Sequence, residues 1–271
     1  MWACDEPSSS WLFDAGGDNR LRMLLAAANW DDVNALRERV TNEIRGQAWL
    51  TDAAQRFASL FVGTFPSIVL ARVFVVVPFE SLPSSDGEFA ARLAERLGSR
   101  ERLGPKTPVL SLLGTYGAEA AWCSRTCSSG HLAIPLLSKA MVEGTPMIAQ
   151  LLAALKVDLA RLDDGRPIYS RQMLGTTNQR FYVPNAKSAR DVRGNFVIPA
   201  QEFVAQYNVQ TVFGMAGSYV DGTLVATILF TTESLDSLTV DRFPSIISNF
   251  KMVTTDLVID ARIRAPAPPG Q

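Results

Sequence analysis

The chain has 271 residues, of which 47% are hydrophobic and 20% are charged, and its formal net charge is -1. This apolar content suffices for one substantial core and excludes a disordered chain. The balanced charge lacks the excess of Lys and Arg that neutralises nucleic-acid phosphates or holds a protein on an anionic membrane, so neither is expected as a partner.

Residues 1–20 are rich in Ser, Gly and Asp and are predicted to form a flexible arm. They carry acidic residues and no uninterrupted apolar segment, which argues against a secretory signal. The three cysteines are too few for a disulfide framework in a chain of this length and agree with a reducing compartment. A cytoplasmic location is therefore expected.

Three helices are predicted before the first strand. Apolar residues at helical spacing indicate a helical extension over residues 21–47, in which Asp31 or Asp32 can cap the second segment. Thr51 is a favourable N-cap for a third helix, which ends near Gly63. The main domain is expected to cover residues 48–260.

The longest apolar run covers residues 68–79 and is interrupted by Arg72. It is about half the length that spans a bilayer, so no membrane insertion is expected. Its β-branched residues, without polar alternation, predict a central strand covered on both faces.

The middle of the chain is less regular. A helix is predicted over residues 86–97, and strands over residues 108–114 and 131–136 with a loop between them. Thr145 followed by Pro146 marks the start of another helix. A polar stretch of roughly forty residues then contains the short extended pieces RFYV and NFVIPA, and a connection of that length is typical of a functional loop or lid.

The final third carries the clearest local signal. Two β-rich runs, at residues 209–220 and 223–231, are separated by Asp221-Gly222, which predicts a tight hairpin. An amphipathic helix with Asp241 as its cap and Pro244 in its first turn follows. The Pro-rich residues 261–271 are expected to be a disordered tail.

The order of these elements resembles that of GAF domains, most clearly over VQTVFGMAGSYVDGTLVATILFTTESLDSLTVDRFPSIISNFKMV. The stretch LLGTYGAEAAWCSRTCSSGHLAIPL also resembles an uncharacterised bacterial domain found in the N-terminal sensory regions of histidine kinases, diguanylate cyclases and phosphatases. The positions that match this second pattern are Ala121, Trp122, Arg125, Gly130, His131, Ala133, Ile134 and Pro135.

The resemblance implies an α/β (α+β) fold with a central antiparallel sheet flanked by helices. It further implies a sensory module that binds a small molecule, forms a homodimer, and acts on an output domain or partner protein through its first and last helices.

His131 is the only histidine and lies between a glycine and an apolar strand. Its imidazole can donate or accept a hydrogen bond near neutral pH, and Trp122 and Arg125 of the preceding loop can complete a recognition cluster. Phe181 and Tyr182 lie in the long polar stretch that roofs the pocket in GAF-like folds. These five residues are the predicted ligand-binding site, against the alternative that each is an ordinary structural residue.

Cysteines offer two alternatives to simple binding. Cys4, Cys123, Cys127 and His131 would make a Cys₃His set for zinc, and a haem would depend on His131 with one cysteine. Cys123 and Cys127 beside Arg125 could instead serve a redox enzyme similar to the free methionine sulfoxide reductases.

Other catalytic signatures, such as G-x-S-x-G, the P-loop and HExxH, are missing from the sequence. A non-catalytic sensory module is therefore the expected function. No particular cofactor or ligand is implied.

Overall fold

The computed structural model describes residues 23–128, 130–164, 168 and 179–265. Its centre is a six-stranded antiparallel sheet in the order β3-β2-β1-β6-β5-β4. The strands are β1 (Ile68–Pro78), β2 (Pro108–Gly117), β3 (Ala133–Pro135), β4 (Gln179–Val183), β5 (Thr211–Ser218) and β6 (Leu224–Thr231). The predicted α+β fold with a central antiparallel sheet flanked by helices is confirmed.

The predicted hairpin joins β5 to β6, and the two strands pair along their full length. Gly222 has a φ of 91°, which glycine adopts without steric cost. The Asp221 carboxylate accepts hydrogen bonds from the Thr223 backbone N–H at 2.9 Å and from its hydroxyl at 2.8 Å. The Asp-Gly pair therefore sets the register of two central strands.

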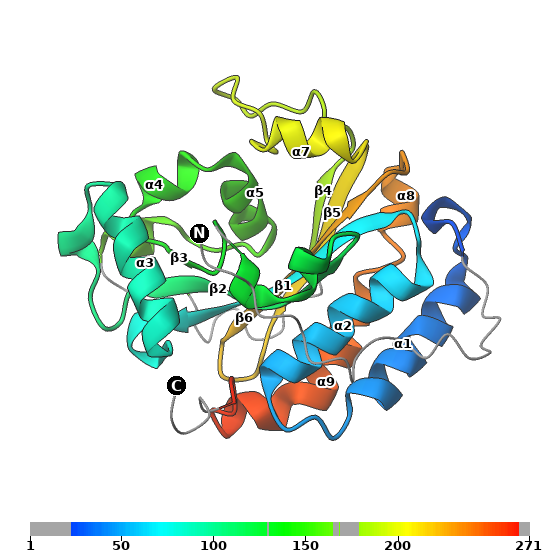
Figure 1. The fold of residues 1–271 in the computed structure, drawn as a ribbon, viewed down its shortest axis with the longest axis horizontal. Coiled ribbons are helices and arrows are strands. Elements are labelled where there is room, and N and C mark those ends of the chain that lie inside the picture. Colours follow the sequence, from blue (N-terminus) through cyan, green and yellow to red (C-terminus); the bar gives the residue numbers. More distant parts are fainter. Residues whose placement is uncertain (1–22, 129, 165–167, 169–178, 266–271) are drawn as a thin grey trace.

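Three helices cover one face of the sheet: α1 (Trp30–Ile44), α2 (Leu50–Thr64) and α9 (Ser245–Ile259). Figure 1 shows them lying side by side, with α2 next to the strands. Phe57 of α2 contacts Phe250 of α9 with ring centroids 4.6 Å apart, and both rings are fully buried. The described part of the predicted helical extension, from residue 23, packs into this same core.

The other helices are shorter and lie mostly around the remaining face and edges of the sheet (Figure 1). They are α3 (Ser84–Arg96), α4 (Lys139–Glu143), α5 (Pro146–Ala154), α6 (Ala160–Asp163), α7 (Gln201–Gln206) and α8 (Ser237–Val240). Single 3₁₀ turns are η2 (Leu25–Ala27), η3 (Phe79–Ser81), η4 (Arg100–Arg102), η5 (Ala120–Cys123) and η6 (Arg125–Cys127). Among the described residues, no helix is both long and apolar enough to cross a bilayer.

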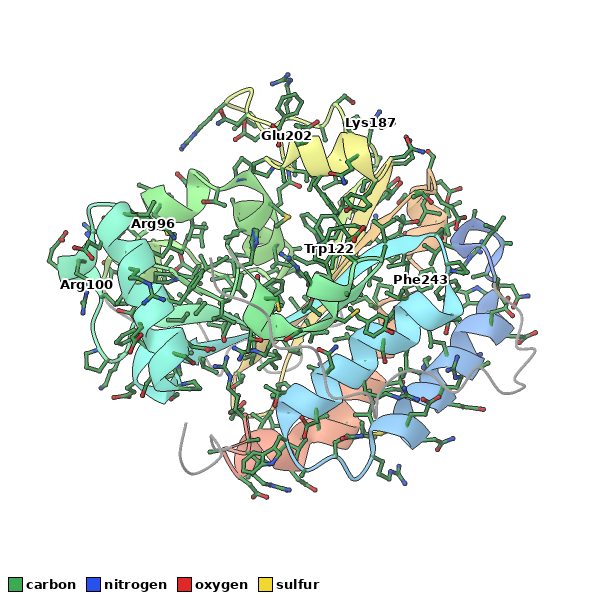
Figure 2. All side chains as sticks on the ribbon, viewed as in Figure 1. Arg96, Arg100, Trp122, Lys187, Glu202 and Phe243 are labelled. Atoms are coloured by element: carbon green, nitrogen blue, oxygen red, sulfur yellow. The ribbon has the colours of Figure 1, made fainter. Side chains whose placement is uncertain are left out.

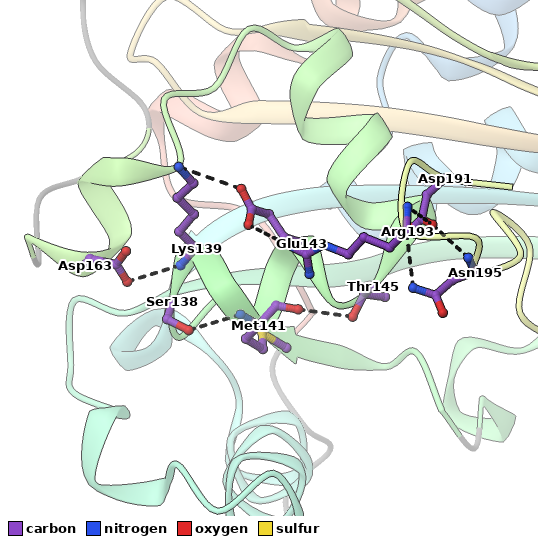
Figure 3. A network of polar contacts seen from close by, with 9 residues as sticks. All are labelled: Ser138, Lys139, Met141, Glu143, Thr145, Asp163, Asp191, Arg193 and Asn195. Atoms are coloured by element: carbon purple, nitrogen blue, oxygen red, sulfur yellow. Dashed lines mark hydrogen bonds and ion pairs between the residues drawn. The ribbon is translucent and has the colours of Figure 1, made fainter.

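Polar contacts join α4 to the segment that leads into α7 (Figure 3). Ser138 caps α4 by accepting a hydrogen bond from the Met141 N–H at 3.2 Å. Glu143 at the end of α4 pairs with Lys139 at 3.7 Å and with Arg193 at 3.0 Å. These contacts fix the segment after β4 against the helices that follow β3.

Several predicted caps are wrong. Asn29, rather than Asp31 or Asp32, is the N-cap of α1, because Asn29 and Asp32 exchange hydrogen bonds in a capping box. Asp236 caps a separate short helix, α8, and α9 begins only after Pro244, so Asp241 does not start the terminal helix.

The cap predicted at Thr51 is also wrong, because α2 begins one residue earlier and takes its partners from far along the chain. The backbone N–H groups of Leu50 and Thr51 donate to the carbonyl oxygens of Arg262 and Ile263, at 2.9 and 3.0 Å. Arg262 and Ile263, which belong to the predicted disordered tail, are thus hydrogen-bonded to the first turn of α2.

The extended piece predicted at NFVIPA forms no strand. One isolated antiparallel bridge between Arg190 and Phe196 is present, and α7, which the sequence pattern did not predict, follows directly.

Candidate ligand-binding site

A pocket of about 610 Å³ opens on the face of the sheet that α1, α2 and α9 do not cover. Its floor comes from β1, β2 and β6, its sides from residues 121–131 and from Met147 of α5, and its remaining wall from residues 198–203. The lining residues are Leu70, Arg72, Phe74, Thr115, Ala121, Trp122, Ser124, Cys127, Ser128, Gly130, His131, Met147, Ile198, Pro199, Ala200, Phe203, Ile228 and Phe230.

Aromatic rings form one wall of the pocket. Trp122 lies 5.5 Å from Phe203 of α7, and Phe203 lies 5.4 Å from Phe230 of β6, between ring centroids. Tyr207 supports this wall at 4.7 Å from Trp122, and its hydroxyl donates to Glu119 at 2.9 Å. Figure 2 shows Trp122 between α7 and the strands. The wall therefore depends on α7 and the loop after β2 lying together.

Arg72 is a charged residue at the centre of the pocket floor. Its neighbours across the sheet are Thr115 and Ile228, which also line the pocket. No described residue accepts a hydrogen bond from Arg72, and its Nε is buried without a partner. Burial lowers the pKa of the Arg72 guanidinium to about 10, so the group remains a cation at neutral pH.

His131 lies close enough to Arg72 to feel its charge. Burial, and then the positive charge of Arg72, lower the pKa of His131 to about 4. The imidazole is therefore neutral at neutral pH and can both donate and accept a hydrogen bond. The hydroxyl oxygens of Thr115 and Ser128 are also buried without a hydrogen-bond partner in the described part of the chain. The pocket thus holds one cation and several unused hydrogen-bonding groups.

Arg125 is not in the pocket lining. Its Nε donates to the Leu112 carbonyl at 2.8 Å, and its guanidinium pairs with Asp86, which is 1% exposed. Arg264 pairs with the same carboxylate and donates to the Ser111 hydroxyl. Burial and the charge of Arg125 lower the pKa of Arg264 to about 10 against the opposing effect of Asp86.

Gln55 of α2 makes hydrogen bonds to the end of β2 and to the loop that follows it, in which Arg125 also lies. Its Nε2 donates to the carbonyl oxygens of Thr115 and Cys123, at 2.8 and 3.0 Å, and its Oε1 accepts from the Thr115 N–H at 3.1 Å. Together, Gln55 and Arg125 fix the backbone of the loop that carries Trp122 and His131.

The five residues predicted as a ligand site are therefore placed in different surroundings. The structure brings Trp122 and His131 together in the pocket lining. Phe181 is buried in the core on the pocket face without lining the pocket. The Tyr182 hydroxyl donates to the Leu235 carbonyl at 2.8 Å, and its ring packs against the core on the opposite face.

The predicted metal set is not assembled in the described residues, among which no group of three His, Cys, Asp or Glu side chains could hold an ion. Cys4 lies outside the described residues. Cys127 lines the pocket and is disulfide-bonded, so it is not the second free thiol that the redox alternative expected beside Cys123. Cys123 is a free cysteine whose Sγ faces the carbonyl oxygens of Gly117 and Glu119, each at 3.6 Å. Cys123 is absent from the described lining of the pocket.

The sequence pattern did not identify Arg72, the cation of the pocket floor, or Phe203, an aromatic residue of its wall. Arg72 had a visible signal, since it is a charged residue inside an otherwise apolar central strand. Phe203 lies on α7, which was not predicted. The pairing of Asp86 with Arg264 joins residues 178 positions apart and leaves no local signal.

No protein-family model matches the chain, and no curated protein sequence is similar to it. Among solved structures, the chain is similar to the phycocyanobilin-bound GAF domain of a cyanobacterial phytochrome, with 11% identity, a TM-score of 0.44, and coverage of 86% of this chain and 98% of the other. The GAF domain of an Acinetobacter phosphoenolpyruvate-protein phosphotransferase has 10% identity, a TM-score of 0.44 and coverages of 86% and 96%.

A free methionine-R-sulfoxide reductase from Neisseria meningitidis, in complex with its substrate, has 7% identity, a TM-score of 0.42 and coverages of 89% and 99%. These are distant similarities in the path of the backbone.

Proposed function

We propose that this chain is a non-catalytic sensory module that binds a small molecule in the pocket over β1, β2 and β6. The observation that carries the proposal is the pocket itself. Its volume of about 610 Å³ lies within the range typical of small-molecule sites, and apolar and aromatic side chains dominate its lining.

The loop that lines the pocket supports a route from the pocket to the chain ends. Ser124, Cys127 and Ser128 belong to the lining, and Arg125 between them pairs with Asp86, the partner of Arg264. Arg264 follows α9, which packs against α1. A ligand that displaces the loop would act on this ion pair and so favour one of two packed states of the terminal helices.

The proposed partners are a second copy of the chain and a signalling output domain or protein. Exposed apolar side chains on α1 and α9 support such contacts: Trp30 is 59% exposed, and Met252 and Ile259 are each 60% exposed. The two helices lie side by side in Figure 1. We propose a cytoplasmic setting for this role.

Native mass spectrometry of the purified protein tests the binding function. The expected result is a retained or added small molecule that is lost in Ala200→Trp, whose indole would enter the pocket. Ala205→Trp is the matched control, because Ala205 is exposed on α7 and outside the described lining. Equal binding by the two variants would contradict the proposed site.

Sedimentation of the purified protein tests the proposed dimer. We expect a concentration-dependent dimer that Met252→Glu weakens, while Val192→Glu, at a fully exposed position away from α1 and α9, leaves it unchanged. A monomer at all concentrations would contradict the homodimer and leave the binding function standing.

A further inference from the structure

We propose that the ligand is an organic monocarboxylate with an apolar, aromatic body, and that Arg72 is the residue that binds its carboxylate. The inference rests on the proposed function, since it names the class of molecule that the same pocket takes. It is carried by the position of Arg72, a cation without a hydrogen-bond or ion-pair partner among the described residues, on the floor of a largely apolar pocket.

A guanidinium removed from water without a partner is unfavourable, because its hydration is lost and nothing replaces it. The Arg72 Nε is buried, and no described residue accepts a hydrogen bond from this side chain. By contrast, Arg125 and Arg264, which are also partly buried, share the carboxylate of Asp86. Within the described residues, Asp86 supplies Arg125 and Arg264 with an anion and nothing does so for Arg72. We infer that a ligand supplies it.

The net charge of the pocket lining determines how many negative charges the ligand should carry. Arg72 is the one charged residue of the described lining, and His131 is neutral. One cation balances one negative charge, so a carboxylate fits, whereas a phosphomonoester brings between one and a half and two charges and would leave a surplus. The planar guanidinium also matches a carboxylate in geometry.

Neighbouring hydroxyl groups can complete the recognition of the carboxylate. The Oγ1 of Thr115, directly across the sheet from Arg72, and the Oγ of Ser128 are buried and unpaired within the described residues. Each can donate one hydrogen bond to a carboxylate oxygen. The neutral His131 can donate another.

The rest of the pocket determines the body of the ligand. Leu70 and Ile228 flank Arg72 on the floor, and the wall of Trp122 and Phe203 stands beside them. Aromatic side chains in this arrangement favour a flat apolar group that stacks or packs edge to face. The carboxylate would lie on the sheet and the aromatic body against α7.

Matched acids and amides test the proposal directly. The probes are benzoate, 2-naphthoate, indole-3-acetate and biphenyl-4-carboxylate, each with its primary amide, together with 2-naphthyl phosphate. Affinities are measured by calorimetry at neutral pH on the full chain. We expect at least one acid to bind about 10- to 100-fold more tightly than its amide and than the phosphate, the value of a charge-assisted hydrogen bond.

Arg72→Leu is the decisive variant. It removes a half-buried charge that has no partner among the described residues, so it is expected to fold at least as stably as the parent chain. The preference for the acid should disappear in Arg72→Leu and remain in Arg92→Leu, a control on the exposed surface of α3. As a second readout, the acid but not the amide should shift the Nε–H resonance of Arg72 in ¹⁵N-labelled protein.

Four results would overturn the inference. If acids and amides bind equally well, or if the preference persists in Arg72→Leu, the pocket binds small molecules but Arg72 does not select an anion. Tighter binding of the phosphate than of the naphthoate would replace the monocarboxylate by a dianion. If no probe binds and native mass spectrometry finds no ligand either, the proposed function fails together with the inference.

Discussion

The two faces of the central sheet carry different kinds of side chain, and β1 contributes to both. Val73 and Val75 point into the core under α1, α2 and α9, whereas Leu70, Arg72 and Phe74 face the pocket. The first face is closed by large apolar residues that are fully buried, among them Phe57 and Phe250. The second combines apolar residues with a cation, a histidine and hydroxyl groups that have no hydrogen-bond partner among the described residues.

The helix-covered face of the sheet therefore contributes mainly to stability, and the pocket face mainly to ligand recognition. Side chains on the helix-covered face gain free energy by removing apolar surface from water. On the pocket face, burial of Arg72 Nε, Thr115 Oγ1 and Ser128 Oγ offsets part of that gain, because these atoms have no hydrogen-bond partner in the described part of the chain. Substitutions on the first face should therefore change the free energy of unfolding, and those on the second should change binding more than stability.

The largest expected effect comes from opening the helix-covered core. Phe57→Ala should lower the free energy of unfolding by about 4 kcal/mol, because the ring is fully buried and packs against Phe61 and Phe250. Urea denaturation followed by circular dichroism measures the loss.

The matched substitution on the other face is Phe203→Ala. Phe203 is only partly buried, so about 1 kcal/mol of stability should be lost while the affinity of the pocket for aromatic acids falls. Equal losses of stability in the two variants would remove the distinction between the faces.

A second variant breaks the buried ion pairs that connect the pocket loop to residues 261–265. Asp86→Asn should cost about 3 to 4 kcal/mol, because two buried guanidinium groups lose their carboxylate. Glu88→Gln on the same helix is the control: its pair with Arg92 is more than half exposed on both sides, and less than about 1 kcal/mol should be lost. Similar losses in the free energy of unfolding for Asp86→Asn and Glu88→Gln would show that burial does not strengthen the Asp86 ion pairs.

The pH dependence of stability sharpens the contrast, because a protonated His131 would place a second cation on the pocket face. The pKa of His131 is about 4 in the folded chain against an ordinary value of 6.5. Between these values the unfolded chain binds the proton and the folded chain does not, so stability is full above pH 6.5 and falls by about 3 kcal/mol as the pH drops to about 4.

His131→Gln should lack this decline, and the difference between the two unfolding curves isolates it. Because the chain has one histidine, an NMR titration of its ring protons reports the pKa directly. A midpoint near 6.5, the ordinary value, would show that His131 is hydrated and distant from Arg72.

A further prediction concerns the close approach of α2 to β2. A Cβ on Gly114 would lie 2.4 Å from the carbonyl carbon of Ala54 and 2.5 Å from the backbone nitrogen of Gln55. Gly114→Ala should therefore cost about 2 kcal/mol, since two backbones have to separate. Gly130→Ala, at the pocket, would meet no heavy atom within 4 Å and should leave the midpoint of thermal unfolding unchanged. A shift in both variants would contradict the tight contact at Gly114.

The sheet was largely predictable from sequence because its strands carry local signals. The β-branched run of β1 and the Asp-Gly turn between β5 and β6 define central strands without reference to the rest of the chain. The site was predictable only in part. Trp122 and His131 lie in one loop, and the structure places both in the pocket lining.

The remaining predicted residues depended on long-range contacts. Phe181 and Tyr182 are adjacent on β4 and face opposite sides of the sheet, so the register against β5 decides their surroundings, and no local pattern fixes it. Arg125 reaches Asp86, 39 positions away, instead of the pocket. The short helix α7, which carries Phe203, has six residues and too little periodicity to be recognised.

The hydrogen bonds from the start of α2 to residues 262 and 263 make two backbone amides reporters of the docking of the C-terminal segment. Amide protons in the first turn of a helix ordinarily exchange with solvent deuterium, because they have no partner within the helix. Those of Leu50 and Thr51 are held by the carbonyl oxygens of Arg262 and Ile263. Their exchange rates will therefore follow the docking of the C-terminal segment at single-residue resolution, with the rest of α2 as the internal standard.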